Sequence, residues 1–139
     1  MVLDMNERIT APLVSIVIPT YNHAPLLHRA IESIRAQTFT HWKAIIVNNF
    51  STDDTVSVVE SFSDNRIQLI DFANNGVIAA SRNKGIELAD GTYVAFLDSD
   101  DTWFPEKLEM CVGVLEENLS LFKPRETPLK KMSDKIIVR

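Results

Sequence analysis

The chain of 139 residues lacks most features that mark secreted, membrane-spanning and nucleic-acid-binding proteins. Its single cysteine, Cys111, excludes an internal disulfide framework and is typical of a reducing compartment. No apolar run approaches the roughly 20 residues of a membrane helix, and residues 1–10 contain acids where a signal peptide carries bases. The net charge of −5 argues against a broad nucleic-acid-binding surface. We therefore expect a cytoplasmic protein with no transmembrane segment and no nucleic-acid partner.

Two kinds of chemical motif are also missing. The sequence has no glycine-rich phosphate loop of the P-loop or dinucleotide-binding type, which excludes P-loop kinases and most dehydrogenases. The histidines His23, His28 and His41 lack metal-ligand spacing, so surface or packing roles are expected for them.

Short apolar runs alternate with amphipathic stretches along most of the chain. Strands are expected at 14–18, 43–47, 66–72 and 92–97, each followed by a helix, the third at 77–89 and the last from Pro105. Parallel strands need such crossovers. The sequence therefore predicts an α/β fold with a mostly parallel sheet and flanking helices.

Local signals give the expected ends and faces of these elements. Pro19 is expected to end the first strand, because proline has no N–H to donate to a neighbouring strand. Ser51 is expected to cap the second helix, and Gly76 to provide a positive φ or a close approach. The inward faces are expected to contain Leu27, Ala30, Ile31 and Ile34 in the first helix, Val56, Val59 and Phe62 in the second, and Leu108, Val112 and Leu115 in the last.

Charge is unevenly distributed along the chain. Residues 120–139 carry six basic and two acidic residues, whereas residues 1–119 carry eight basic and seventeen acidic ones. We expect an N-terminal extension at 1–13, a globular portion at 14–119, and a basic tail at 120–139 without regular structure.

Three carboxylates directly follow the fourth predicted strand. Asp98 and Asp100 are two residues apart, so on an extended chain their side chains can share a hard cation. Oxygen ligands of this kind suit Mg²⁺ or Mn²⁺ rather than zinc. The alternative is a solvated acidic turn in which Asp101 or Thr102 caps the next helix.

Polar and aromatic residues follow the other strands. Tyr21 has a ring that can stack on a base or pack over the strand end. Asn48 and Asn49 can pair with a base edge or form an Asx-type turn. Arg82 and Lys84 can meet phosphate charge or lie on a solvated helix face.

Four segments in order resemble the amino-terminal half of the family 2 glycosyltransferases, which have the Rossmann-like GT-A fold. They are VSIVIPTYN (14–22), IIVNNFSTDDT (45–55), NNGVIAASRNKGI (74–86) and GTYVAFLDSDDTWFP (91–105). The resemblance spans residues 14–117. It implies transfer of a sugar from a nucleotide diphosphate sugar, usually UDP-linked, with inversion. A saccharide, a lipid-linked molecule or a protein would be the acceptor, in polysaccharide biosynthesis, with the enzyme at the inner face of the membrane.

The resemblance also implies a site. Asp98 and Asp100 match the family's DxD motif and would bind Mn²⁺ or Mg²⁺, while Arg82 would lie near the diphosphate. Asn49 replaces an aspartate that accepts a hydrogen bond from the base, which leaves the base preference open. The implied nucleotide-sugar site contains Pro19, Tyr21, Asn49, Arg82, Asp98, Ser99 and Asp100.

The sequence departs from the family after its DxD motif. The family's catalytic base and acceptor site lie in a second half, but only 38 residues follow Asp101 and none resembles that half. We therefore leave the base unassigned and expect a truncated member that self-associates and turns over donor very slowly. The alternatives are a non-catalytic nucleotide-binding or interaction module derived from the same fold, and an aspartate-nucleophile phosphatase. Asp98, Asp100 and Thr102 also fit the DxDxT motif of such phosphatases. The phosphatase is disfavoured because those enzymes carry this motif after their first strand, whereas here it follows the fourth predicted strand.

Overall fold

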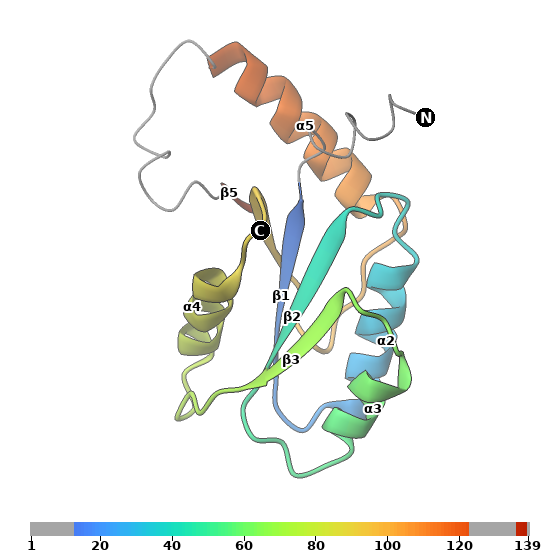
Figure 1. Cartoon of the computed structure of the whole chain (residues 1–139), viewed down its shortest axis with the longest axis vertical. Helices are drawn as coiled ribbons and strands as arrows, with labels where there is room; N and C mark the ends of the chain where they lie inside the picture. The colour runs from blue at the N-terminus through green and yellow to red at the C-terminus, as the bar shows by residue number, and fades with distance from the viewer. Residues whose placement is uncertain (1–12, 123–135, 139) are drawn as a thin grey trace.

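The structure, a computed structural model, describes residues 13–122 and 136–138. Within these residues, five parallel strands form one sheet in the order β3-β2-β1-β4-β5, flanked by four helices (Figure 1). The strands are β1 (Val14–Thr20), β2 (Trp42–Asn48), β3 (Ile67–Asp71), β4 (Tyr93–Phe96) and β5 (Ile136–Val138). The helices are α2 (Ala24–Arg35), α3 (Thr55–Ser61), α4 (Ile78–Leu88) and α5 (Lys107–Phe122). The predicted α/β fold with a parallel sheet is confirmed.

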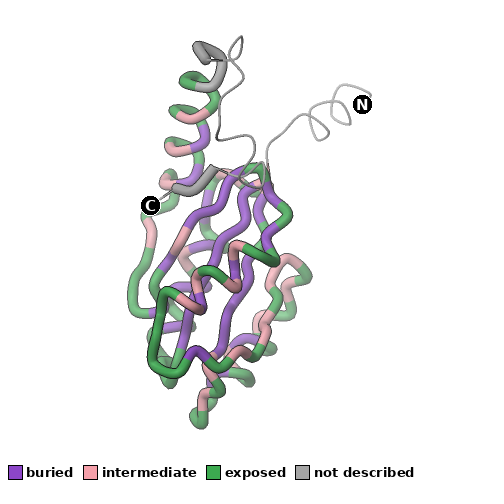
Figure 2. The backbone as a smooth tube through the Cα atoms, turned by 90° about the vertical axis from the view of Figure 1, so that its left-hand side faces the viewer, coloured by how far each residue is buried: buried purple, intermediate pink, exposed green. Residues whose placement is uncertain are grey.

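The central strand β1 lies between two layers of helices. All seven of its residues are buried, as Figure 2 shows for the inner strands. Ile16 and Ile18 belong to the larger apolar core, with residues of α2, α3 and α5. Val17 points to the opposite face and packs in a smaller core that includes Ile86 of α4. A continuous β-branched run suits a strand buried on both faces.

Pro19 does not end β1, contrary to expectation. The strand stays paired with β2 through Thr20, while pairing with β4 stops at Val17. The Val17 carbonyl accepts from the Leu97 N–H on the β4 side, and the Thr20 carbonyl accepts from the Asn49 N–H on the β2 side. Because backbone groups alternate in direction along a parallel strand, the nitrogen of Pro19 faces the β4 side beyond the last pair. Its missing donor therefore costs the sheet no hydrogen bond.

Two further local expectations are wrong. Ser51 does not cap α3, which begins at Thr55, because the Ser51 hydroxyl donates to Asn48 Oδ1 at 2.6 Å. Val56 is exposed, whereas Val59 of the same helix is buried as expected.

The C-terminal part contains more regular structure than expected. Helix α5 buries Leu108 and Val112, as predicted, but continues to Phe122. Strand β5 pairs with β4 inside the segment expected to be an unstructured tail. This strand was not predicted because a run of three apolar residues is too short for periodicity to detect. The rest of that tail and residues 1–12 of the expected extension lie outside the described residues. No helix in the described ranges is both long and apolar enough to cross a membrane.

An ion-pair cluster braces the amino ends of β2 and β3. The carboxylate of Asp64, whose side chain is 7% exposed, accepts from Arg66 Nη2 at 2.9 Å and from Arg35 Nε at 3.3 Å. The hydrogen bond from Arg66 is the main reason that the pKa of Asp64 falls to about 2. The Arg66 guanidinium also lies 3.8 Å from the Trp42 ring centroid. These charges satisfy one another, so we assign them a structural role.

Gly85 allows α4 to approach β1 closely. A Cβ built on Gly85 would lie 2.2 Å from Val17 Cγ1, well inside the usual carbon–carbon contact of roughly 3.5 to 4.0 Å. Arg82 precedes Gly85 on the same helix, so this approach also sets the position of Arg82 over the sheet.

We expect Gly85→Ala to lower the free energy of unfolding by about 1–3 kcal/mol, because the added methyl group must move α4 or distort Val17. Gly113→Ala on α5 is the matched control, since nothing lies within 4 Å of a Cβ built there. Alanine there should be neutral or stabilising by up to about 1 kcal/mol. Chemical denaturation measures both changes. A Gly85→Ala variant as stable as the Gly113→Ala variant would contradict the close packing of α4 on β1.

Candidate functional site

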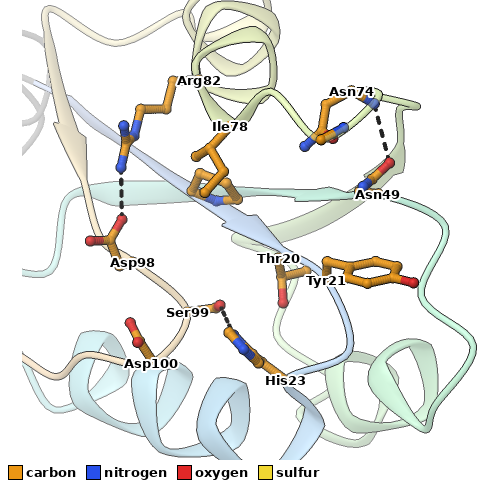
Figure 3. A pocket seen from close by; sticks show the side chains of 12 residues that line it. Thr20, Tyr21, His23, Asn49, Asn74, Ile78, Arg82, Asp98, Ser99 and Asp100 are labelled. Carbon is orange, nitrogen blue, oxygen red and sulfur yellow. Dashed lines mark hydrogen bonds and ion pairs between the residues drawn. The ribbon is translucent and has the colours of Figure 1, made fainter.

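The candidate site lies at the carboxyl ends of β1 and β4. The chain runs from β1 to β2 on one side of the sheet and later returns to place β4 on the other side of β1. In open α/β sheets, ligands bind at such a topological switch point. A pocket of about 400 Å³ occurs there (Figure 3), lined by Pro19, Thr20, Tyr21, His23, Asn49, Asn74, Gly76, Ile78, Arg82, Asp98, Ser99 and Asp100.

All seven residues of the predicted site line this pocket. They come from the ends of three strands and from α4, although up to 81 positions separate them in the sequence. Lys84, the other basic candidate, does not line it. Its ammonium lies 3.4 Å from Glu87 and 5.9 Å from the ring centroid of Phe72. Of the two basic candidates, therefore, Arg82 lines the pocket and Lys84 does not.

The loops after β1 and β2 hold each other in place. Asn22 Oδ1 accepts from the Thr52 N–H at 2.8 Å, and Asp53 Oδ2 accepts from the Ala24 N–H at 3.0 Å. The other Asp53 oxygen accepts from Thr55, and this bond is the main reason that the pKa of Asp53 is lowered. The two loops are therefore crosslinked in both directions.

The two asparagines after β2 have different surroundings. Asn48 is buried, donates to Asp71 Oδ1 at 2.9 Å and accepts from Ser51, so its side chain serves the local turn. Asn49 lines the pocket, and its Oδ1 accepts from the Asn74 N–H at 3.1 Å (Figure 3). Because Oδ1 keeps a second lone pair, Asn49 can offer a ligand both this acceptor and its NH₂ group.

The loop at 74–76 is tied to α4. Asn74 Nδ2 donates to the buried Ser81 hydroxyl at 2.8 Å, and Asn74 Oδ1 accepts from the Gly76 N–H at the same distance. The buried Ser81 hydroxyl therefore holds this loop against α4. Gly76 has a φ of +80°, which confirms the expected positive φ.

Arg82 and Asp98 form an ion pair across the pocket. Arg82 Nη2 lies 3.0 Å from Asp98 Oδ1, and the two side chains are 39% and 57% exposed (Figure 3). Exposed pairs of this kind contribute little to stability, roughly 0 to 1 kcal/mol. Both groups therefore remain accessible to a charged ligand.

Asp98 and Asp100 fit a divalent cation that takes most of its ligands from elsewhere. Both line the pocket and offer hard carboxylate oxygens, although one oxygen of Asp98 is paired with Arg82. No group of three or more His, Cys, Asp or Glu residues suited to a metal occurs in the part of the chain that the structure describes. Mg²⁺ commonly binds through one or two carboxylates, with phosphates and water completing its shell. The donor set matches that kind of site.

Sequence comparisons identify the family of the chain. The family model of Glycosyl transferase family 2 matches residues 15–125. The chain belongs to glycosyltransferase family 2. TuaG of Bacillus subtilis (strain 168), a glycosyltransferase assigned to teichuronic acid biosynthesis, is 39% identical over 113 residues, which are 80% of this chain and 45% of TuaG. The Escherichia coli glucosyltransferase WfgD is 38% identical over 106 residues, which are 76% of this chain and 42% of WfgD.

Solved structures with a similar fold are also found. TarS 1-349 of S. aureus, in complex with UDP-GlcNAc, superposes with a TM-score of 0.70 at 28% identity, covering 75% of this chain and 31% of that one. The mannosyltransferase PcManGT of Pyrobaculum calidifontis, in complex with GDP-Man and Mn²⁺, gives 0.61 at 26% identity, covering 69% and 30%. This chain therefore spans less than half the length of the two curated relatives and about a third of the two solved chains.

Several pocket residues of this family 2 chain were missed by sequence reasoning. His23 was expected to have a surface or packing role, but it lines the pocket, as do Thr20, Asn74 and Ile78. The spacing of the histidines does not reveal His23, because its hydrogen-bond partner, Ser99, is 76 positions away in the chain. Its position directly after the ProThrTyrAsn segment is the signal that could have found it.

The Thr20 hydroxyl is buried, and none of the described residues gives it a hydrogen-bond partner. We expect Thr20→Val to raise the free energy of unfolding by about 1 kcal/mol, since the cost of an unsatisfied buried hydroxyl is removed while the shape is kept. Thr55→Val is the matched control and should be destabilising, because the buried Thr55 hydroxyl donates to Asp53. Denaturant titration compares the two variants. A Thr20 variant destabilised as much as the control would contradict the unsatisfied state.

Proposed function

We propose that this chain binds the nucleotide diphosphate sugar of a family 2 glycosyltransferase that uses Mn²⁺ or Mg²⁺. The nucleotide is proposed to be UDP. The observation that carries the proposal is the convergence of seven predicted site residues on one pocket at the switch point of the sheet. The TarS complexes with UDP and UDP-GlcNAc support the uridine nucleotide. The Mn²⁺ in the mannosyltransferase complex supports the cation.

The base is proposed to bind beside Pro19, Tyr21 and Asn49. Tyr21 is 52% exposed, so its ring is accessible for stacking. From the end of β2, Asn49 can donate from its NH₂ group to a base oxygen and can accept from a base N–H with the second lone pair of Oδ1, the first being used by Asn74. A base that carries both a carbonyl group and a ring N–H suits this arrangement.

The diphosphate is proposed to lie between Arg82 and the Asp98–Asp100 turn. Arg82 supplies a planar guanidinium that can bind a phosphate in two places, exchanging part of its contact with Asp98. Asp98 and Asp100 would hold the cation. When bound, a divalent cation neutralises the leaving diphosphate as a Lewis acid.

The transfer is proposed to invert the anomeric carbon. An acceptor hydroxyl oxygen forms a bond to that carbon as the bond to the diphosphate breaks on the opposite face, and the hydroxyl proton passes to a general base. Asp98 and Asp100 do not suit this base, since cation-binding carboxylates are directed at the phosphates. The catalytic base therefore stays unassigned.

The acceptor is proposed to be a lipid-linked saccharide at the inner face of the membrane. The name of WfgD describes transfer to GlcNAc-diphosphoundecaprenol, and that of TuaG describes teichuronic acid biosynthesis. A second candidate function is a non-catalytic nucleotide-binding module. It is favoured by the pocket's lack, among the described residues, of any carboxylate besides Asp98 and Asp100. Turnover of UDP-sugar with a lipid-linked acceptor separates the two functions.

We expect UDP to bind more tightly in Mn²⁺ than in EDTA, and Asp100→Asn to remove most of that difference, because it removes a charged cation ligand. Asp101→Asn is the matched control. It makes the same charge change one position further on, at a residue outside the pocket lining. Titration calorimetry of the three proteins in both buffers makes the comparison. Equal UDP affinity of the wild type in Mn²⁺ and EDTA would refute the metal-assisted site.

Asn49→Asp should change the base preference. Aspartate can keep the hydrogen bond from the Asn74 N–H, but it replaces the NH₂ donor with an acceptor. Preference for UDP over GDP should rise, by up to the roughly 1.4 kcal/mol that corresponds to a tenfold change in affinity, because aspartate restores the acceptor that the family resemblance implies for the base of a UDP-linked donor. Competition binding of UDP and GDP to both proteins measures the ratio. An unchanged ratio would remove Asn49 from the base site.

A further inference from the structure

A single side-chain hydrogen bond joins the start of α2 to the acidic turn after β4. His23 Nδ1 lies 2.9 Å from Ser99 Oγ, and 76 positions of sequence separate the two residues. Both line the pocket, and Figure 3 shows them facing each other next to Asp100. Neither His23 nor this bond has a role in the function proposed above.

The burial of the turn alternates about Ser99. Ser99 is 4% exposed, whereas Asp98 and Asp100 on either side of it are exposed. The Asp98 carbonyl accepts from the Asp101 N–H at 3.0 Å, so Ser99 and Asp100 are the central residues of a tight turn. With Ser99 held on the buried side of this turn, Asp98 and Asp100 lie on its exposed side, where both line the pocket.

The other end of this bond is fixed by the core. The His23 carbonyl accepts from the Leu27 N–H at 2.7 Å at the start of α2. Leu27 and the neighbouring Ala24 are buried. The His23 side chain itself is exposed, so removing it opens no cavity in the core. It is a polar contact made from a rigid anchor.

We infer that His23 is a positioning residue that holds Ser99 and thereby presents Asp98 and Asp100 to the cation and diphosphate. This inference rests on the proposed function. It adds a residue that acts on the cation site without touching the cation. Without the contact, the turn samples other conformations, and binding of the cation and nucleotide together must restrict it again. Residues that orient metal ligands typically change metal affinity by about 10- to 100-fold when they are replaced.

The test compares UDP affinity in Mn²⁺ with UDP affinity in EDTA. The ratio of these affinities should fall about tenfold in His23→Ala and in Ser99→Ala, while the affinity in EDTA stays within about twofold. The double variant should lose no more than either single variant, because both remove one contact. His28→Ala is the control, since His28 is an exposed residue of α2 outside the pocket lining, where it contacts Glu32 at 3.3 Å and the Phe62 ring at 4.9 Å between centroids.

A conservative variant separates positioning from a general loss of structure. In His23→Asn, the amide lies at the same distance from the backbone as Nδ1 of histidine, so it can still bond to Ser99. It should keep most of the affinity ratio that His23→Ala loses. A ratio unchanged in His23→Ala, or lost equally in the alanine and asparagine variants, would overturn the inference.

Hydrogen exchange tests the same contact without a ligand. Amides at 97–102 should exchange faster in His23→Ala and Ser99→Ala than in the wild type and His28→Ala. A wild type that binds no UDP would refute the proposed function, and exchange would then decide the contact alone. A wild type that binds UDP with Mn²⁺, together with unchanged exchange and an unchanged affinity ratio in His23→Ala, would refute the positioning role and leave the proposed function standing.

Discussion

The site depends on the unequal pairing of β1 with its two neighbours. β1 pairs with β2 through Thr20, but its pairing with β4 stops at Val17. The last residues of β1 therefore diverge from β4, and the crevice between the two strand ends becomes the pocket. An unpaired N–H would normally be costly in such a position. Pro19 occupies the place where that N–H would face the crevice, so the divergence leaves no unsatisfied donor.

The helices are arranged around this divergence. Gly85 lets α4 pack directly on Val17, the last β1 residue paired with β4, and this brings Arg82 within 3.0 Å of Asp98. On the other face, α2 begins at the end of β1 and carries His23 to Ser99. Each helix thus contributes one side-chain contact to the turn after β4. Backbone packing in the core determines where the polar groups of the pocket lie.

The sequence predicted the core of this arrangement better than its contacts. Periodicity located the central strands and the buried face of α2, because burial on one or both faces leaves a pattern in consecutive residues. The effect of Pro19 was wrongly predicted, because the sequence shows that an N–H is missing but not which neighbouring strand the proline nitrogen faces. Ser51 was expected to cap α3, but Asn48 lies close enough to accept from its hydroxyl. His23 was missed because its partner is 76 positions away, and no local pattern encodes that contact.

Backbone strain is concentrated in the loops around the pocket. Of the four described non-glycine residues with a positive φ, Asn22, Phe50 and Asn75, with values of 51°, 49° and 54°, lie in these loops, and Ser63 lies elsewhere. This conformation costs an ordinary residue roughly 1 to 2 kcal/mol, and Phe50 gains no burial in return because it is 58% exposed. Strain of this kind persists where the surroundings over-determine the backbone. Here the hydrogen bonds accepted by Asn22 and Asp53 crosslink the first two loops. These bonds hold the strained loops in place before any ligand binds.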